Sequence, residues 1–367
     1  MSPRPLARRR MPAGLIGVAI AAVVALPAFS DEVAQTRVYD NRLTEIAEPA
    51  PILADYPEYC EPVRESKRFQ AAPLVLDEQP TLGVRAWRFS YNARGIIEMD
   101  NQIAGNATAI IVVHPWGIDD GQGWDSPQPA GVAFNCTPEK NRMYHEHVER
   151  VLNPLLERLR PHVKIVAYSL PGGEDDIRRK LYRSFRATPT AQQRAEGRQE
   201  LTAKLADFEY RGNPLDAQLM LDREPTMADY FRKFPGLDSS AKFNAEGFWD
   251  LPIPVVRQIN VAPDDVVIYD AEGYPPLRDF LKSQGIRHVL LMGYATDMCY
   301  CRTTAGYENL DPDFNVFLVG DATVATFPAN NTPRYATNAA LSFASLEHLV
   351  TQGSWIETID ASVAQSE

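Results

Sequence analysis

Continuous apolar runs of strand length alternate with helical patterns along most of this chain. The first run, residues 108–114 (TAIIVVH), is rich in β-branched residues, as expected for a strand buried on both faces. Similar runs occupy residues 163–170, 265–270, 288–293 and 315–320. Helical patterns cover residues 143–160, 275–284, about 298–309 and 333–351. This alternation predicts an α/β fold with a doubly wound, mainly parallel sheet, whose site lies at the carboxyl ends of the strands.

Other segments flank or interrupt this α/β pattern, which we assign to residues 105–355. Residues 31–104 predict an N-terminal extension with short strands, including a hairpin within residues 73–100. Residues 172–249 are charged and interrupt the alternation of strands and helices, which predicts a helical insertion with helices over 190–208 and 226–233. Residues 356–367 form a C-terminal tail. We expect the insertion and the loop over residues 115–140 to cover the pocket.

The first thirty residues differ in character from the rest. They contain four arginines, no acidic residue, an apolar run from Gly14 to Leu26 and small residues around Ala28 and Ser30. This pattern predicts a cleaved signal peptide, because the apolar run is shorter than the roughly 20 residues that span a bilayer. The alternative is an uncleaved membrane anchor. We therefore expect a secreted or periplasmic protein with no stable membrane anchor after cleavage, and the sequence does not distinguish the two compartments.

The charge and the cysteine count exclude two classes of protein. The chain carries a net charge of −11, whereas a nucleic-acid binder needs a basic face. Its 4 cysteines in 367 residues do not make a disulfide scaffold. After export, Cys60 and Cys136 could pair in an oxidising compartment, although sequence alone does not fix the connectivity of cysteines.

Cys299 stands where a predicted strand turns into a predicted helix, in the segment GYATDMCY of residues 293–300. A helix N-terminus favours the thiolate form of a cysteine, and nearby backbone N–H groups can receive an oxyanion. The alternative is a buried core thiol, which is the common state of a free cysteine.

The turn around Cys299, followed by Thr303, resembles the G-x-x-T-D-x-C-V-x-x-T motif of the isochorismatase-like cysteine hydrolases, which include nicotinamidases and related amidases. Residues 316–326 (VFLVGDATVAT) also resemble the fifth strand of that superfamily. The resemblance covers about residues 105–355, interrupted by the insertion. It implies that Cys299 is the nucleophile and that the N–H groups of Ala295 and Cys299 form an oxyanion hole. It also implies a cis peptide bond between Tyr294 and Ala295.

Two positions depart from the pattern of the superfamily. The aspartate at the end of its first strand corresponds here to His114, and the lysine after its third strand corresponds to Asp270. A histidine can deprotonate a thiol and a carboxylate can orient the imidazole, so we hypothesise a Cys299–His114–Asp270 triad. The alternatives are a capping or core histidine at position 114 and a plain loop carboxylate at position 270. Because His114 precedes Pro115, we expect it to be extended at the end of its strand.

Several residues near these strand ends are candidates for the substrate pocket: Trp116, Asp119, Asp120, Tyr274 and Tyr294. Asp119 and Asp120 would contact the substrate or, alternatively, orient His114 in place of Asp270. The alternative for the two aspartates is that they stabilise a turn, which an Asp-Gly pair favours. The alternative for the aromatic residues is ordinary packing in the core or at the surface.

Metal and cofactor binding find no support in the sequence. His145 and His147 are two residues apart and lie on different faces of a helix, and the Asp-x-His motif that holds metal in nicotinamidases does not occur. We therefore expect no metal and no cofactor. Cys301 is interpreted as a packed helix thiol, with a redox role together with Cys299 as the alternative.

The favoured function is an exported cysteine hydrolase that cleaves a C–N bond of a small, amide-like substrate through a thioester acyl-enzyme. Vinyl-ether cleavage, which gives the superfamily its name, depends there on the aspartate that His114 replaces. The alternative from another class is a catalytically silent small-molecule binding protein with the same fold. The resemblance also implies a homo-oligomer.

Overall fold

The computed structural model describes residues 37–65, 67–90, 95–117, 138–207, 250–326 and 332–359. The chain divides into two compact units, Met1–Val38 and Tyr39–Glu367. The fold described below is that of the second unit.

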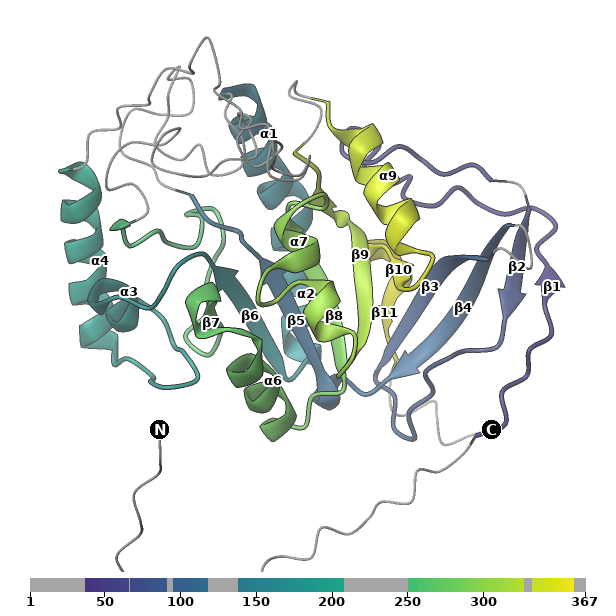
Figure 1. The fold of residues 1–367 in the computed structure, drawn as a ribbon, viewed down its shortest axis with the longest axis horizontal. Helices are drawn as coiled ribbons and strands as arrows, with labels where there is room; N and C mark the ends of the chain where they lie inside the picture. Colours follow the sequence, from purple (N-terminus) through teal and green to yellow (C-terminus); the bar gives the residue numbers. More distant parts are fainter. Residues whose placement is uncertain are drawn as a thin grey trace, which may run out of the picture. The chain divides into compact units, whose positions relative to one another are not determined.

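The described residues form one 11-stranded sheet, with the order β1-β2-β4-β3-β10-β9-β8-β5-β6-β7 and with β11 paired to β3 (Figure 1). The strands are β1 Thr44–Glu45, β2 Arg68–Ala71, β3 Leu82–Ser90, β4 Gly95–Ile103, β5 Thr108–Val113, β6 Ile165–Leu170, β7 Val266–Tyr269, β8 His288–Tyr294, β9 Asn315–Val324, β10 Leu349–Thr351 and β11 Ile356–Thr358.

The strands from β10 to β7 pair in parallel throughout, which confirms the predicted α/β class with a mainly parallel sheet. β5 lies between β6 and β8, and all six of its residues are buried, as its unbroken apolar run predicts. The connection after β5 leads to β6 on one side, whereas the connection after β8 leads to β9 on the other. The point where adjacent strands send their connections in opposite directions is the usual ligand site of such sheets.

The N-terminal strands continue this sheet. β3 and β4 form the antiparallel hairpin expected within residues 73–100, and β3 also pairs antiparallel with β10. β2 runs parallel to β4, and the buried Glu98 of β4 forms ion pairs with Arg68 of β2 and Arg85 of β3. The first residues assigned to the C-terminal tail form β11, which pairs with β3.

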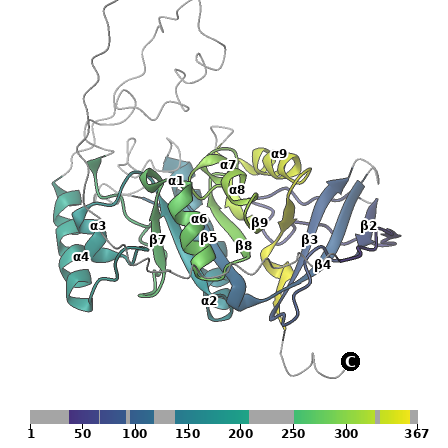
Figure 2. The same ribbon diagram turned by 60° about the horizontal axis from the view of Figure 1, so that its bottom comes forward.

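Helices cover both faces of the sheet, with α1 and α2 on one face and α6, α7 and α9 on the other (Figures 1 and 2). The helices are α1 Pro138–His147, α2 Asn153–Leu159, α3 Asp176–Leu181, α4 Ala191–Ala206, α6 Tyr274–Ser283, α7 Cys299–Arg302, α8 Tyr307–Leu310 and α9 Arg334–Ala344. A π-helical turn, Val148–Leu152, joins α1 to α2 within the helical stripe expected over residues 143–160. α3 and α4 belong to the predicted insertion, and the second helix expected there, over residues 226–233, lies outside the described residues.

Two helices predicted from the sequence are shorter in the structure. The helix expected over residues 333–351 ends at Ala344, and residues Leu349–Thr351 instead form β10, which pairs with β9. The sequence predicted a longer helix because the apolar residues of β10 continue the helical spacing. The helix expected over residues 298–309 is two short helices. The hydroxyl of Thr303 donates to the carbonyl oxygen of Cys299 (2.9 Å) and ends α7.

None of the helices in the described part of the chain is long and apolar enough to span a bilayer.

Candidate active site

The carboxyl ends of three parallel strands of one sheet bring the candidate residues together. β5 ends at Val113 and is followed by His114, β7 ends at Tyr269 and is followed by Asp270, and β8 leads through a turn to Cys299. Val113 is opposite Gly293 in β8, so both chains leave the sheet at the same level. The sheet topology thus places His114 and Cys299 at the switch point between β5 and β8, and Asp270 at the same edge of the sheet, two strands from β5.

Gly293 allows β8 to approach β5 closely at this point. Its φ is +104°, and a Cβ atom there would lie 2.2 Å from the carbonyl oxygen of Val113. A side chain is therefore excluded for two reasons, the backbone conformation and the contact with β5. This accounts for the glycine that begins the turn motif.

His114 and Asp270 are hydrogen-bonded to each other. The distance from Nε2 of His114 to Oδ2 of Asp270 is 2.8 Å, and the side chain of His114 is 8% exposed while that of Asp270 is 25% exposed. The expectation that His114 is extended before Pro115 is wrong, since its φ is +45°, on the left-handed side of the Ramachandran plot. A non-glycine residue in that region is strained, and such residues cluster at functional sites.

The electrostatics of His114 link it to both other members of the hypothesised triad. Burial lowers the pKa of His114, but its hydrogen bonds with Asp270 and Cys299 and the charges of both groups outweigh this and raise the pKa to about 10. The ring is therefore an imidazolium at neutral pH. A histidine in contact with a cysteine sulfur can take up the thiol proton, as a nucleophilic cysteine requires.

Asp270 is itself held in place from the side of Cys299. The hydroxyl of Thr304, which follows α7, donates to the carbonyl oxygen of Asp270 at 2.9 Å. The other carboxylate oxygen of Asp270, Oδ1, is buried and has no hydrogen-bond partner among the described residues. The hydroxyl of Ser169 at the end of β6 is likewise buried without a partner in the described part of the chain. Both polar atoms are sites where a bound polar group would find a hydrogen bond.

The turn between β8 and α7 contains the expected cis peptide bond between Tyr294 and Ala295. The carbonyl oxygen of Ala295 accepts hydrogen bonds from the N–H groups of Met298 (2.9 Å) and Tyr300 (3.1 Å). Among the described residues, no backbone hydrogen bond uses the N–H groups of Ala295 or Cys299. Backbone N–H donors without a backbone partner are what an oxyanion hole requires.

A network behind this turn was not predicted from the sequence. His147 is fully buried, its Nε2 lies 2.9 Å from the carbonyl oxygen of Asp321, and its Nδ1 lies 2.6 Å from the hydroxyl of Tyr294. A carbonyl oxygen can only accept, so Nε2 carries the proton and Nδ1 accepts from Tyr294. Burial lowers the pKa of His147 to about 4, which keeps this neutral tautomer. His147 thus fixes the aromatic side chain that precedes the cis peptide bond.

The candidate wall residues have different environments. Tyr294 is 1% exposed and packs edge-on against Tyr144, so its place in the substrate pocket stays a prediction. The side chain of the last residue of β8 turns into the core. Trp116 is 6% exposed and its backbone pairs with Val255. The hydroxyl of Tyr274 donates to Asp313 at 2.7 Å, away from the triad.

Other expectations about the pocket fall on residues outside the described part of the chain. Asp119 and Asp120 belong to this group, as do most of the loop 115–140 and residues 208–249 of the insertion.

The cysteines outside the triad are described only in part. Cys60 is fully buried, its thiol donates to the carbonyl oxygen of Gly320 at 3.2 Å, and burial raises its pKa. Cys136 lies outside the described residues, so their pairing stays a prediction. Cys301 is a free thiol that donates to the carbonyl oxygen of Thr296 at 3.0 Å, as a packed helix thiol would.

In the described ranges no group of three or more histidine, cysteine, aspartate and glutamate side chains is arranged to hold a metal ion.

Comparisons with known proteins agree with the motif in the turn. Residues 241–351, which include Asp270 and Cys299 but not His114, match the family model of the isochorismatase domain. This match over residues 241–351 confirms the resemblance that the turn around Cys299 indicates. No curated protein matches this chain.

Solved structures of this superfamily align with most of the chain at low identity. A cysteine hydrolase from Pseudomonas syringae pv. phaseolicola 1448A is 16% identical with a TM-score of 0.36, and the match covers 69% of this chain and 91% of that one. An isochorismatase-like hydrolase from Alkaliphilus metalliredigens is 14% identical with a TM-score of 0.36, covering 67% and 95%. A nicotinamidase from Bacillus subtilis is 13% identical with a TM-score of 0.30, covering 67% and 99%.

Proposed function

We propose that this protein is a cysteine hydrolase that cleaves a C–N bond of a small, amide-like substrate through a thioester acyl-enzyme. The observation that carries the proposal is the position of His114, which interacts with Asp270 on one side and with Cys299 on the other. A cysteine, a histidine and an orienting carboxylate are the parts of a cysteine nucleophile with its acid–base partner.

The first half of the reaction uses the ion pair between the thiolate and the imidazolium. The thiolate of Cys299 attacks the carbonyl carbon, and the N–H groups of Ala295 and Cys299 stabilise the oxyanion that forms. The imidazolium of His114 then donates its proton to the leaving nitrogen. The C–N bond breaks, the amine departs, and the acyl group stays on the sulfur as a thioester.

The second half regenerates the enzyme with water. Neutral His114 removes a proton from a water molecule, which attacks the thioester carbonyl. The tetrahedral intermediate collapses, the carboxylic acid leaves, and Cys299 returns as a thiolate beside the imidazolium. Asp270 keeps its charge throughout and stabilises the imidazolium in both halves.

The proposal is tested by incubating the purified protein with a panel of small primary amides, carbamoyl compounds and ureido compounds, with release of ammonia or amine as the readout. Wild-type protein is compared with Cys299→Ser, His114→Ala and, as a matched thiol control, Cys301→Ser. The proposal expects turnover that the first two variants abolish and the third retains. An acyl adduct in the intact mass that Cys299→Ser lacks and Cys301→Ser retains identifies the thioester on Cys299.

Ligand binding without turnover or adduct, unchanged in Cys299→Ser, would instead indicate the silent binding protein.

We further propose export, supported by the basic and apolar pattern of the first thirty residues. Intact-mass measurement of protein from the native host tests it. The expected mature chain begins at or close to Asp31, and a full-length mass in the membrane fraction would contradict cleavage.

A further inference from the structure

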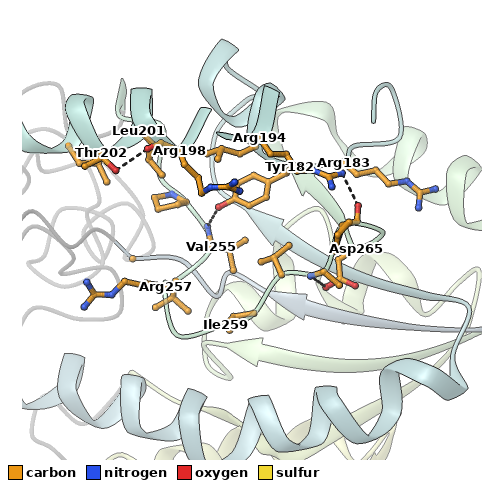
Figure 3. A pocket seen from close by; sticks show the side chains of 18 of the residues that line it. Tyr182, Arg183, Arg194, Arg198, Leu201, Thr202, Val255, Arg257, Ile259 and Asp265 are labelled. Carbon is orange, nitrogen blue, oxygen red and sulfur yellow. Dashed lines mark hydrogen bonds between the residues drawn. The ribbon is translucent and has the colours of Figure 1, made fainter. Parts of the chain in front are cut away.

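A cavity away from the triad lies between helix α4 and the chain that leads into β7 (Figure 3). Its volume is about 730 Å³, a size that suits a small molecule. α4, the end of α3 and residues 254–263 provide most of its walls, and none of the triad residues lines it. The proposed hydrolase reaction therefore assigns no role to this cavity.

One face of α4 gives the cavity a charged part and an apolar part. Arg194, Arg198, Leu201 and Leu205 all line it and follow one another at helical spacing. The two arginines lie in the first half of the helix and the two leucines in the second. The cavity is thus basic towards one end of α4 and apolar towards the other.

The acidic residues of α4 do not neutralise this face. Glu200 forms an ion pair with Lys180 of α3 at 2.6 Å, and Glu196 accepts a hydrogen bond from Gln192 at 2.9 Å. Neither glutamate lines the cavity. The carboxylates of the helix therefore lie on a different face from Arg194 and Arg198.

Two arginines of the cavity contact neutral groups. Arg194 donates to the carbonyl oxygen of Pro263 at 3.0 Å, and Arg183, on the strand side, donates to the carbonyl oxygen of Asp264 at 3.0 Å. Among the described residues, Arg183, Arg194 and Arg198 form no ion pair with a carboxylate. In a chain with a net charge of −11, three arginines without an acidic partner around one cavity indicate a place for an external anion.

The acidic residue in the described lining, Asp265, is already neutralised. Its carboxylate pairs with Arg160 at 3.0 Å and accepts from the hydroxyl of Tyr168 at 3.0 Å and the N–H of Ala262 at 2.9 Å. It therefore leaves the positive charge of the cavity uncompensated.

We propose that this cavity binds a small amphipathic carboxylate, an alkyl or aryl acid. Its carboxylate lies at Arg194 and Arg198, where guanidinium groups provide charge-assisted hydrogen bonds. Its apolar part runs along Leu201 and Leu205 and faces the apolar residues of the opposite wall around Val255. In Figure 3, Arg198 lies beside Tyr182 on the α4 side of the cavity, while Arg257 points away from this group.

The test uses three probes with the same eight-carbon chain and different heads: octanoate, octan-1-ol and octyltrimethylammonium. Isothermal titration calorimetry measures their binding to the full chain. The proposal expects octanoate to bind most tightly and the cation to bind least. Arg198→Ala weakens octanoate binding about tenfold, which corresponds to about 1.4 kcal/mol, because a charge-assisted hydrogen bond to the carboxylate is lost. Arg198→Glu abolishes it, and Arg198→Lys retains most of it.

Two controls separate this site from the rest of the molecule. Arg302→Ala removes an arginine that is 80% exposed and outside the cavity, so binding stays unchanged. Cys299→Ser also leaves binding unchanged, which makes the result independent of the proposed hydrolase activity. Equal binding of the three probes, no binding of octanoate, or octanoate binding that ignores Arg198 would each overturn the proposal. Arg198 is exposed, so its variants are expected to fold.

Discussion

Replacing Asp270 with asparagine removes the negative charge next to His114 while nearly conserving shape. The hydrogen bond between the two residues is 2.8 Å long, and a hydrogen bond to a charged group contributes about 1.5–3 kcal/mol. One pKa unit corresponds to about 1.4 kcal/mol, so the substitution lowers the pKa of His114 by about one to two units. From about 10 in the wild type, the midpoint falls to about 8–9.

The assay is an NMR titration of protein labelled at the ring carbon of histidine. The chain has 6 histidines, and the resonance of His114 is identified by its loss in His114→Gln. Asp313→Asn is the matched control, because Asp313 is a carboxylate that pairs with Tyr274 and Lys282 away from the triad. The control leaves the His114 midpoint unchanged. A wild-type midpoint near 6.5, or an Asp270→Asn midpoint equal to that of the wild type, would refute the reasoning.

The same pair of proteins differs in the pH dependence of stability. The pKa of His114 is about 10 in the folded state against an ordinary value of 6.5. The contribution of His114 to the free energy of unfolding is therefore complete below pH 6.5 and is lost as the pH rises towards 10. Urea unfolding of the wild type therefore shows a loss of stability over this range. Asp270→Asn shows a smaller loss that is complete at lower pH.

Three further substitutions test the surroundings of the turn. Tyr294→Phe lowers the free energy of unfolding by about 1–2 kcal/mol in urea titrations, because Nδ1 of His147 loses its donor inside the core; an unchanged stability would contradict the assigned tautomer. Gly293→Ala lowers the free energy of unfolding by more than about 3 kcal/mol or prevents folding. Its control Gly285→Ala, at a glycine with positive φ but nothing within 4 Å of an added Cβ, lowers it by about 1 kcal/mol in thermal unfolding. Equal losses of stability in the two variants would contradict the close approach of β8 to β5. Burial raises the pKa of Asp321 from 3.8 to about 7, so the stability of the wild type relative to Asp321→Asn falls by at most about 1.4 kcal/mol per pH unit between pH 4 and 7 and is flat above; a difference that grows with pH would refute this assignment.

The fold was predictable from the sequence where burial is complete. The strands β5, β6, β7 and β8 lie within one or two residues of the runs that predicted them, because a strand covered on both faces must be apolar throughout. The spacing of residues 333–351 could not show the end of α9, since the apolar residues that pair β10 with β9 continue the helical period.

The sequence predicted which residues come together at the site, but not the conformations that they adopt there. The motif around Cys299 and the strand ends at His114 and Asp270 indicated which residues meet, because the parallel strands of one sheet end at the same edge. The direction of the Tyr294 side chain and its hydrogen bond to His147 depend on a residue 147 positions away in the chain, which no local pattern reveals. The left-handed backbone of His114 is equally hidden, since the following proline favours the opposite conformation.

The most direct test of the central claim is the rate at which iodoacetamide alkylates Cys299 at pH 7, in wild-type protein and in His114→Ala. Mass spectrometry of the peptide that contains residue 299, in a Cys301→Ser background, reports the modified fraction over time. If Cys299 is a thiolate stabilised by the His114 imidazolium, the wild type reacts rapidly and His114→Ala reacts at least about tenfold more slowly. Slow labelling of the wild type at a rate that His114→Ala does not change would contradict the account.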